Sequence, residues 1–115
     1  MVTLEQLNAA LFLKEFKILI EKDRIWVVQR DKNLTPLGLN NTQCIQELLD
    51  LSVENYVAGP KKDRDRPGVI WEFGKMIGDT EVYIKLKIAD DGAEKHAVCI
   101  SFHPAEWPMN YPFVM

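Results

Sequence analysis

The chain has 115 residues, of which 47% are hydrophobic and 27% are charged, a composition typical of one globular domain with a single core and not of a disordered chain. Its formal net charge of −3 argues against a generally basic nucleic-acid-binding protein, because neutralising phosphates requires a clustered surplus of lysine and arginine. A local cluster of lysine and arginine can still bind phosphates in a chain whose net charge is negative.

The first predicted element is a helix that opens at Thr3 and extends to about Lys22. Thr3 and Gln6 have the spacing of a capping box. The apolar residues of this helix fall on two rows: Leu4, Leu7, Leu11 and Ile18, then Phe12, Phe16, Leu19 and Ile20. Such wide apolar coverage predicts a helix packed closely on a sheet.

A strand and a second, shorter helix are predicted next. Residues 24–30 are β-branched and aromatic, and residues 31–33 supply a turn. Asn40 and Gln43 repeat the capping pattern. The helix that follows has one apolar face, formed by Cys44, Ile45, Leu48 and Leu49, and Ser52 can cap a final turn over residues 53–56.

A charged loop bounded by glycine and proline is predicted over residues 59–68. It carries Lys61, Lys62, Arg64 and Arg66 against Asp63 and Asp65, a surplus of two positive charges. Such a local surplus suits contacts with a phosphate backbone.

Three strands in a meander complete the predicted fold. The first covers residues 69–75, with Trp71 and Phe73 on one face and Ile70, Glu72 and Gly74 on the other. The other two are residues 81–88 and 97–103, joined by the turn-forming run 89–95. Alternation places Val82, Ile84, Leu86 and Ile88 on the core face with Val98, Ile100 and Phe102. We therefore predict an α+β fold with an antiparallel sheet and the N-terminal helices packed on one of its faces.

The opposite face of the last two strands combines acid/base groups. It carries Tyr83, Lys85 and Lys87 beside Cys99, Ser101 and His103. Tyrosine and histidine take part in proton transfer, whereas a face selected only for solubility would more usually show lysine, glutamate and threonine. Plain solvation of one sheet face is the other interpretation of this pattern.

The last residues form an extended tail. Prolines at positions 104, 108 and 112 exclude a helix interior or a central strand, and Trp107, Tyr111 and Phe113 lie between them. We predict a strap over residues 104–115 whose aromatic side chains pack on a body formed by residues 1–103, within a single domain. A peptide-like or base-stacking aromatic surface is the alternative.

Neither cysteine belongs to a metal-binding motif. Cys44 and Cys99 lack CxxC spacing and a nearby histidine pair, so we expect no metal site, no disulfide and no cofactor. The most apolar segment, residues 9–20, contains three charged residues and is too short to span a membrane. The N-terminus lacks the pattern of a secretory signal, so we expect a cytoplasmic protein.

Several short segments, taken in order, resemble one family of proteins. They are Leu37-Gly-Leu39 before the second helix, residues 51–56 (LSVENY), Trp71, residues 82–88 (VYIKLKI) and residues 100–102 (ISF). From about Phe12 to His103 this series is similar to the MqsR family of toxins from type II toxin-antitoxin systems. The resemblance implies a RelE-like fold and a metal-independent endoribonuclease, an mRNA interferase, that cleaves messenger RNA and binds a cognate antitoxin protein.

The same resemblance implies a candidate site. Tyr83 takes the position of the family's essential strand tyrosine, His103 stands where the family has a lysine, and Glu72 stands where it has a glutamine. The family's lysine after the LSVENY motif falls on Val57. Its role would therefore pass to Lys61, Lys62 or an arginine of the charged loop.

RNA cleavage without a metal requires a base for the 2'-hydroxyl proton, an acid for the leaving 5'-oxygen, and cations for the charge on the phosphorane. His103 suits either proton-transfer role, Tyr83 can donate a hydrogen bond or a proton, and Glu72 can act as a base or orient His103. The predicted catalytic residues are Tyr83, His103, Glu72 and Lys85, and the predicted RNA-binding residues are Lys61, Lys62, Arg64, Arg66 and Lys75.

A different class of function fits the same elements. A non-catalytic RelE-like module would use this sheet to dock a partner protein, or a peptide strand on its edge. Convergence of Tyr83, His103 and Glu72 in one cleft would favour the enzyme, because a docking surface does not need that arrangement.

Overall fold

A computed structural model describes residues 2–28 and 37–114 of the chain. The elements, in order, are helix α1 (Leu4–Glu21), strand β1 (Ile25–Val27), helix α3 (Asn41–Leu49), the 3-10 turn η2 (Val53–Asn55), and strands β2 (Tyr56–Lys62), β3 (Val69–Ile77), β4 (Thr80–Asp90) and β5 (Lys95–Pro104). Among the described residues, no helix has the length and apolar character needed to cross a bilayer.

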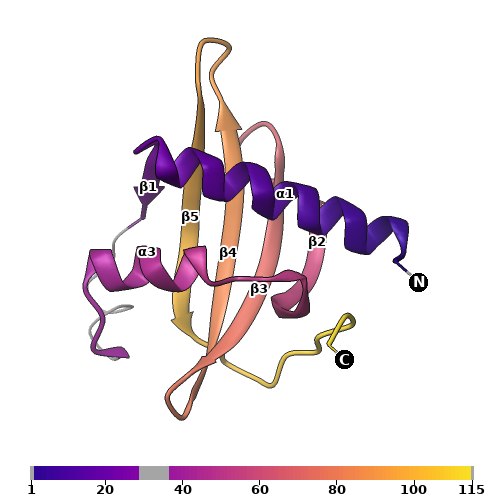
Figure 1. Ribbon diagram of the computed structural model, residues 1–115, viewed down its shortest axis with the longest axis vertical. Helices are drawn as coiled ribbons and strands as arrows, with labels where there is room; N and C mark the ends of the chain where they lie inside the picture. Colours follow the sequence, from indigo (N-terminus) through magenta and orange to yellow (C-terminus); the bar gives the residue numbers. More distant parts are fainter. Residues whose placement is uncertain (1, 29–36, 115) are drawn as a thin grey trace.

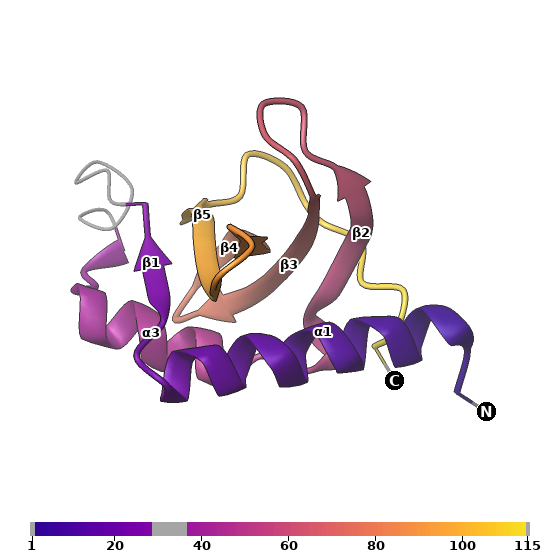
Figure 2. The ribbon, with the colours of Figure 1, turned by 90° about the horizontal axis from the view of Figure 1, so that it is seen from above.

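In the part of the chain that the structure describes, the strands form one five-stranded sheet in the order β1-β5-β4-β3-β2. Strands β2 to β5 are an antiparallel meander, and β1 pairs with β5 in parallel. The parallel pair makes the sheet mixed, where the sequence predicts an antiparallel one. Both helices cover the same face of this sheet (Figures 1 and 2). The predicted α+β class, with N-terminal helices on one face, is confirmed.

The helices begin where their capping residues predict. The Gln6 N–H donates to Thr3 Oγ1, and Gln6 Oε1 accepts a hydrogen bond from the Thr3 N–H at 2.8 Å. Asn40 and Gln43 form the same reciprocal pair at the start of α3. Each pair satisfies backbone donors that the first helical turn leaves without partners.

The core lies between α1 and the central strands. Phe12 stacks on Trp71 of β3 with ring centroids 4.8 Å apart, and Phe16, Phe73 and Ile84 are fully buried. Only one of the two apolar rows of α1 takes part. Leu4, Leu7, Leu11 and Ile18 are exposed, because a single sheet layer can cover only one side of a helix.

Strand β2 is a correction to the predicted loop over residues 59–68. Gly59 to Lys62 belong to this strand, so the connection to β3 is only residues 63–68 and the meander has four strands instead of three. Pro60 is tolerated because β2 is an edge strand, where a missing N–H need not break a ladder. Gly59 is needed because an added Cβ would lie 3.0 Å from Ile70 O and from Trp71 Cα.

The core row of β5 is a second correction. Lys85 pairs with Ser101 but Leu86 pairs with Cys99, so Ile100 is an extra residue in a β-bulge. As a result, the residues of β5 that precede the bulge point to the faces opposite to those that strict alternation from Phe102 predicts. Ala97 and Cys99 are buried, while Val98 and Ile100 lie on the opposite face with Lys85, contrary to the predicted core row and to the predicted polar position of Cys99. Phe102 is buried as predicted.

The segment after β5 crosses the sheet face that the helices leave open. The Ala105 N–H donates to Glu81 O at 2.8 Å, and the Phe113 ring stacks on Tyr56 with centroids 4.8 Å apart. Tyr111 and Phe113 therefore pack on the body, as predicted for a strap. Trp107 does not, because 72% of its surface is exposed.

Candidate functional site

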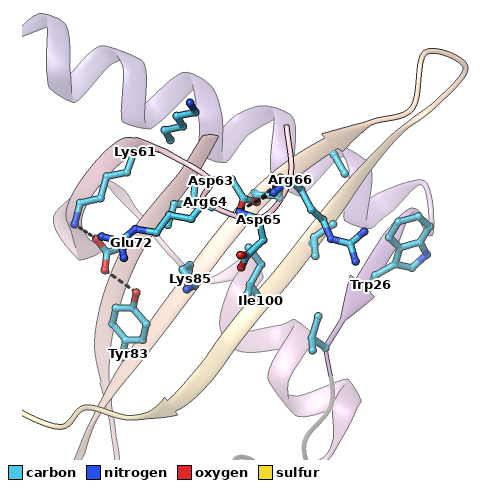
Figure 3. A pocket seen from close by; sticks show the side chains of 16 residues that line it. Trp26, Lys61, Asp63, Arg64, Asp65, Arg66, Glu72, Tyr83, Lys85 and Ile100 are labelled. Carbon is cyan, nitrogen blue, oxygen red and sulfur yellow. Dashed lines mark hydrogen bonds and ion pairs between the residues drawn. The ribbon is translucent and has the colours of Figure 1, made fainter. Parts of the chain in front are cut away.

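The open face of the sheet carries a cleft of about 640 Å³ (Figure 3). The loop of residues 63–68 forms one wall, and strands β1 to β5 supply the floor and the other walls. Its lining residues are Trp26, Val28, Lys61, Lys62, Asp63, Arg64, Asp65, Arg66, Ile70, Glu72, Tyr83, Lys85, Lys87, Ala89, Val98 and Ile100. All predicted RNA-binding residues except Lys75 lie here.

The cleft is positively charged although the chain is acidic. Among the described residues, six lysines and arginines and three acidic residues line it, a net charge of +3 against −3 for the whole chain. A concave surface of one sign concentrates the field and attracts ligands of the opposite charge. The overall acidity of the chain therefore does not argue against a polyanionic ligand at this face.

An ion pair between the buried Lys87 and the partly buried Asp63 holds the loop against the sheet. Lys87 is 6% exposed, and its ammonium donates to Asp63 Oδ2 at 2.6 Å and to Pro67 O at 2.9 Å. Asp63 Oδ1 in turn accepts from the Asp65 N–H at 2.9 Å. Arg64 and Arg66, in the same loop, are exposed and line the cleft. Sequence reasoning placed Lys87 on this face but missed its part in holding the loop.

This pair predicts an acid-sensitive component of stability. The hydrogen bond from Lys87, then those from the backbone at Asp65 and Arg66, lower the pKa of Asp63 from 3.8 to about 2. Because the folded-state pKa is lowered, the contribution is fully present above about pH 4 and is lost as the pH falls toward 2. Urea unfolding between pH 7 and pH 2 should show this loss. The Asp63→Asn variant should lack it, and the exposed Asp79→Asn variant should retain it.

Glu72, Tyr83 and Lys61 form a linked group at one end of the cleft (Figure 3). The Tyr83 hydroxyl donates to Glu72 Oε2 at 2.6 Å, and the Lys61 ammonium pairs with Glu72 Oε1. Burial would raise the pKa of Glu72, but the hydrogen bonds from Lys61 and Tyr83 lower it below its usual value. Burial and the bond to Glu72 raise the pKa of Tyr83. Near neutral pH the site thus holds a carboxylate and a protonated phenol.

His103 completes this group from the neighbouring strand. It pairs with Tyr83 across β4 and β5, and the two ring centroids are 5.2 Å apart. Its Nδ1 lies 2.8 Å from Pro104 O. A carbonyl oxygen can only accept, so Nδ1 donates this hydrogen bond, and a neutral imidazole in this arrangement would carry its lone pair on Nε2. The structure therefore brings together three of the four predicted catalytic residues.

Lys85, the fourth predicted catalytic residue, also faces the cleft. In the sheet it pairs with Glu72 of β3 and with Ser101 of β5. Its positive charge contributes to the lowered pKa of Glu72. Within the described residues Lys85 has no ion-pair partner. Its ammonium is therefore open to an anionic ligand.

Lys75 lies away from the other predicted site residues. It shares the face of Trp71 and Phe73, and its ammonium pairs with Glu47 of α3 on the helix side of the sheet. We therefore assign it a structural role between β3 and α3. In the described part of the chain, no group of three or more His, Cys, Asp or Glu side chains has an arrangement that could hold a metal ion.

Searches against protein-family models, curated protein sequences and solved structures gave no significant match to this chain.

Proposed function

We propose that the chain is a metal-independent endoribonuclease that cleaves messenger RNA, and that it acts in the cytoplasm as the toxin of a type II toxin-antitoxin pair. The observation that supports this most is the junction of Glu72, Tyr83 and His103 at one end of a positively charged cleft. The cleft suits a phosphate backbone, and the junction supplies proton-transfer groups beside it.

The protonation states suggest the role of each side chain. His103 Nε2 takes the proton of the 2'-hydroxyl, whose oxygen attacks the adjacent phosphorus, and the bond from phosphorus to the 5'-oxygen breaks. Tyr83 gives its proton to that 5'-oxygen. An acid must hold its proton at the start of the step, and the raised pKa of Tyr83 ensures this. Proton return from the imidazolium to the phenolate restores both groups.

The charged neighbours complete the proposal. The Glu72 carboxylate accepts from Tyr83 and from Lys61, so it fixes the direction of the phenol and positions an ammonium beside the reacting phosphate. Lys85 faces the same space and can offset the negative charge of the phosphorane. Glu72 therefore acts as a positioning residue for Tyr83, and it bonds to Tyr83 and Lys61 instead of orienting His103 as the sequence suggested.

Cleavage in the presence of a chelator tests the proposal directly. The purified chain should cut single-stranded messenger RNA in EDTA and leave 2',3'-cyclic phosphate and 5'-hydroxyl ends, because the nucleophile is the 2'-oxygen and the acid and base are side chains. End-specific ligation followed by sequencing would detect both ends. A Tyr83→Phe preparation purified in the same way controls for contaminating ribonucleases.

Two results would contradict this function. Cleavage that requires Mg²⁺ would exclude the side-chain mechanism. RNA that is neither bound nor cut, together with tight binding of a co-expressed protein, would favour the non-catalytic docking module.

A further inference from the structure

A second hollow, of about 280 Å³, adjoins the charged cleft and shares two residues with it. Glu72, Tyr83, His103, Ala105, Glu106, Trp107 and Met109 line this hollow. Glu72 and Tyr83 line both spaces, so the proposed reacting group forms the wall between them. An RNA strand with its scissile phosphate at this wall would place nucleotides on both sides of it.

The two spaces differ in charge. The larger cleft is lined by six lysines and arginines, whereas the described residues around the smaller hollow include none and contribute Glu72 and Glu106. Acidic side chains disfavour a phosphate there but not an uncharged nucleobase. The aromatic rings of Tyr83, His103 and Trp107 offer surfaces on which a base can stack.

The segment that carries Trp107 is anchored on both sides of it. The Ala105 N–H donates to Glu81 O, the Met109 N–H donates to Glu81 Oε1 at 3.2 Å, and the Tyr111 hydroxyl donates to Glu81 Oε2 at 2.8 Å. The segment packs on β3 at Gly74, where the Met109 and Tyr111 side chains would have to shift if a Cβ were present. Trp107 is thus an exposed ring on a fixed backbone.

An exposed tryptophan on an anchored segment needs an explanation other than packing. The neighbouring aromatics Tyr111 and Phe113 are half-buried, while Trp107 leaves 72% of its surface in solvent at the rim of the hollow. Burying such a ring against a base gains stacking energy at little entropic cost, because its backbone is already held.

We propose that Trp107 is a nucleobase-stacking residue, which receives the base of the nucleotide that flanks the scissile phosphate on the side away from the charged cleft. This inference rests on the proposed RNA substrate. It adds a recognition site, formed by the residues after β5, to a cleft that otherwise recognises only phosphates.

Binding of an uncleavable RNA at several salt concentrations tests the inference. The probe is a short, fluorescein-labelled single-stranded RNA of mixed sequence with 2'-O-methyl groups throughout, and the readout is fluorescence anisotropy. Trp107→Ala should weaken binding about tenfold and leave the slope of log K against log salt unchanged, because stacking releases no counterions. Trp107→Phe should retain most of the affinity.

The control is Val114→Ala, which removes an exposed apolar side chain of the same segment that does not line the hollow. It should bind like the unmodified chain. Since Trp107 is exposed, far-ultraviolet circular dichroism should show all three variants folded.

The outcomes separate the two proposals. Normal RNA binding by Trp107→Ala would overturn the stacking role and leave the proposed function intact. Equal losses in the alanine and phenylalanine variants would also overturn it, because they would indicate a hydrogen bond from the indole N–H instead of stacking. No RNA binding by the unmodified chain would overturn the proposed function itself.

Discussion

Tyr83→Phe is expected to reduce the rate of RNA cleavage by about a hundredfold to ten-thousandfold, the range for loss of a general acid or base. The substitution removes only the hydroxyl that donates to Glu72, and it keeps the ring beside His103. Tyr83 is partly exposed on the open face of the sheet, so no core cavity forms and the fold should persist. Single-turnover cleavage of a defined RNA measures the effect.

His103→Ala should produce a loss in the same range. It removes the Nε2 lone pair that the bond from Nδ1 to Pro104 O leaves available. If the two residues act as a unit, the double variant should be little worse than either single variant. Growth of a bacterial host that expresses each variant gives an independent readout, because loss of cleavage should remove growth inhibition.

Two matched variants control for the chemical changes themselves. Tyr111→Phe removes a hydroxyl that also donates to a glutamate on the open face, Glu81, but lies outside both spaces. The segment of Trp107 keeps its other two bonds to Glu81, from the Ala105 and Met109 N–H groups. His96→Ala removes the other histidine, which stacks on Trp26 at 4.1 Å. Both should cleave at close to the normal rate. Full activity in Tyr83→Phe and His103→Ala would show that the junction does not perform the chemistry.

The approach of Tyr83 and His103 could be predicted from the sequence because it depends on one hairpin. The predicted turn over residues 89–95, which the structure shortens to residues 91–94, and the alternation of each strand place the two side chains on one face, and the structure pairs them directly. Glu72 followed from its position beside Trp71 in the adjacent strand. Alternation also places Lys75 with Trp71 and Phe73, so its position on the helix side was available from the sequence and was missed.

The β-bulge at Ile100 could not be predicted, since either alternate row of β5 offers apolar side chains. Strict alternation selects the more hydrophobic row, Val98 and Ile100, over Ala97 and Cys99. The structure buries the smaller pair before the bulge, and Val98 and Ile100 become part of the cleft lining. No residue type in this strand marks the inserted position, which is fixed by pairing with β4.

Strand β2 was missed for a different physical reason. Gly59 and Pro60 are typical turn residues, but their cost is small in an edge strand that has one partner. The consequence reaches the site, because the strand directs Lys61 onto Glu72 and leaves only residues 63–68 as a loop. The other basic side chains of this region, Lys62, Arg64 and Arg66, therefore line one cleft instead of being spread along a long loop.

Replacing Lys62, Arg64, Arg66 and Lys85 together with alanine should weaken RNA binding strongly and flatten its salt dependence. These four basic residues line the cleft and have no ion pairs within the described residues, unlike Lys61 and Lys87. Each phosphate that the variant no longer neutralises should reduce the slope of log K against log salt by about 0.7 to 0.9, so four of them would reduce it by about 3. Anisotropy titrations between low and physiological salt would measure this slope.

A second quadruple variant separates local charge from total charge. Lys14, Lys22, Arg24 and Lys95 gather around α1 and the start of β5, outside the cleft, and their replacement by alanine changes the net charge from −3 to −7, as in the first variant. Long-range repulsion falls off within about a Debye length of 8–10 Å at physiological salt. The second variant should therefore keep nearly the full slope. If both variants reduced the slope of log K against log salt equally, RNA binding would depend on the net charge of the molecule. That result would contradict the cleft as the binding site.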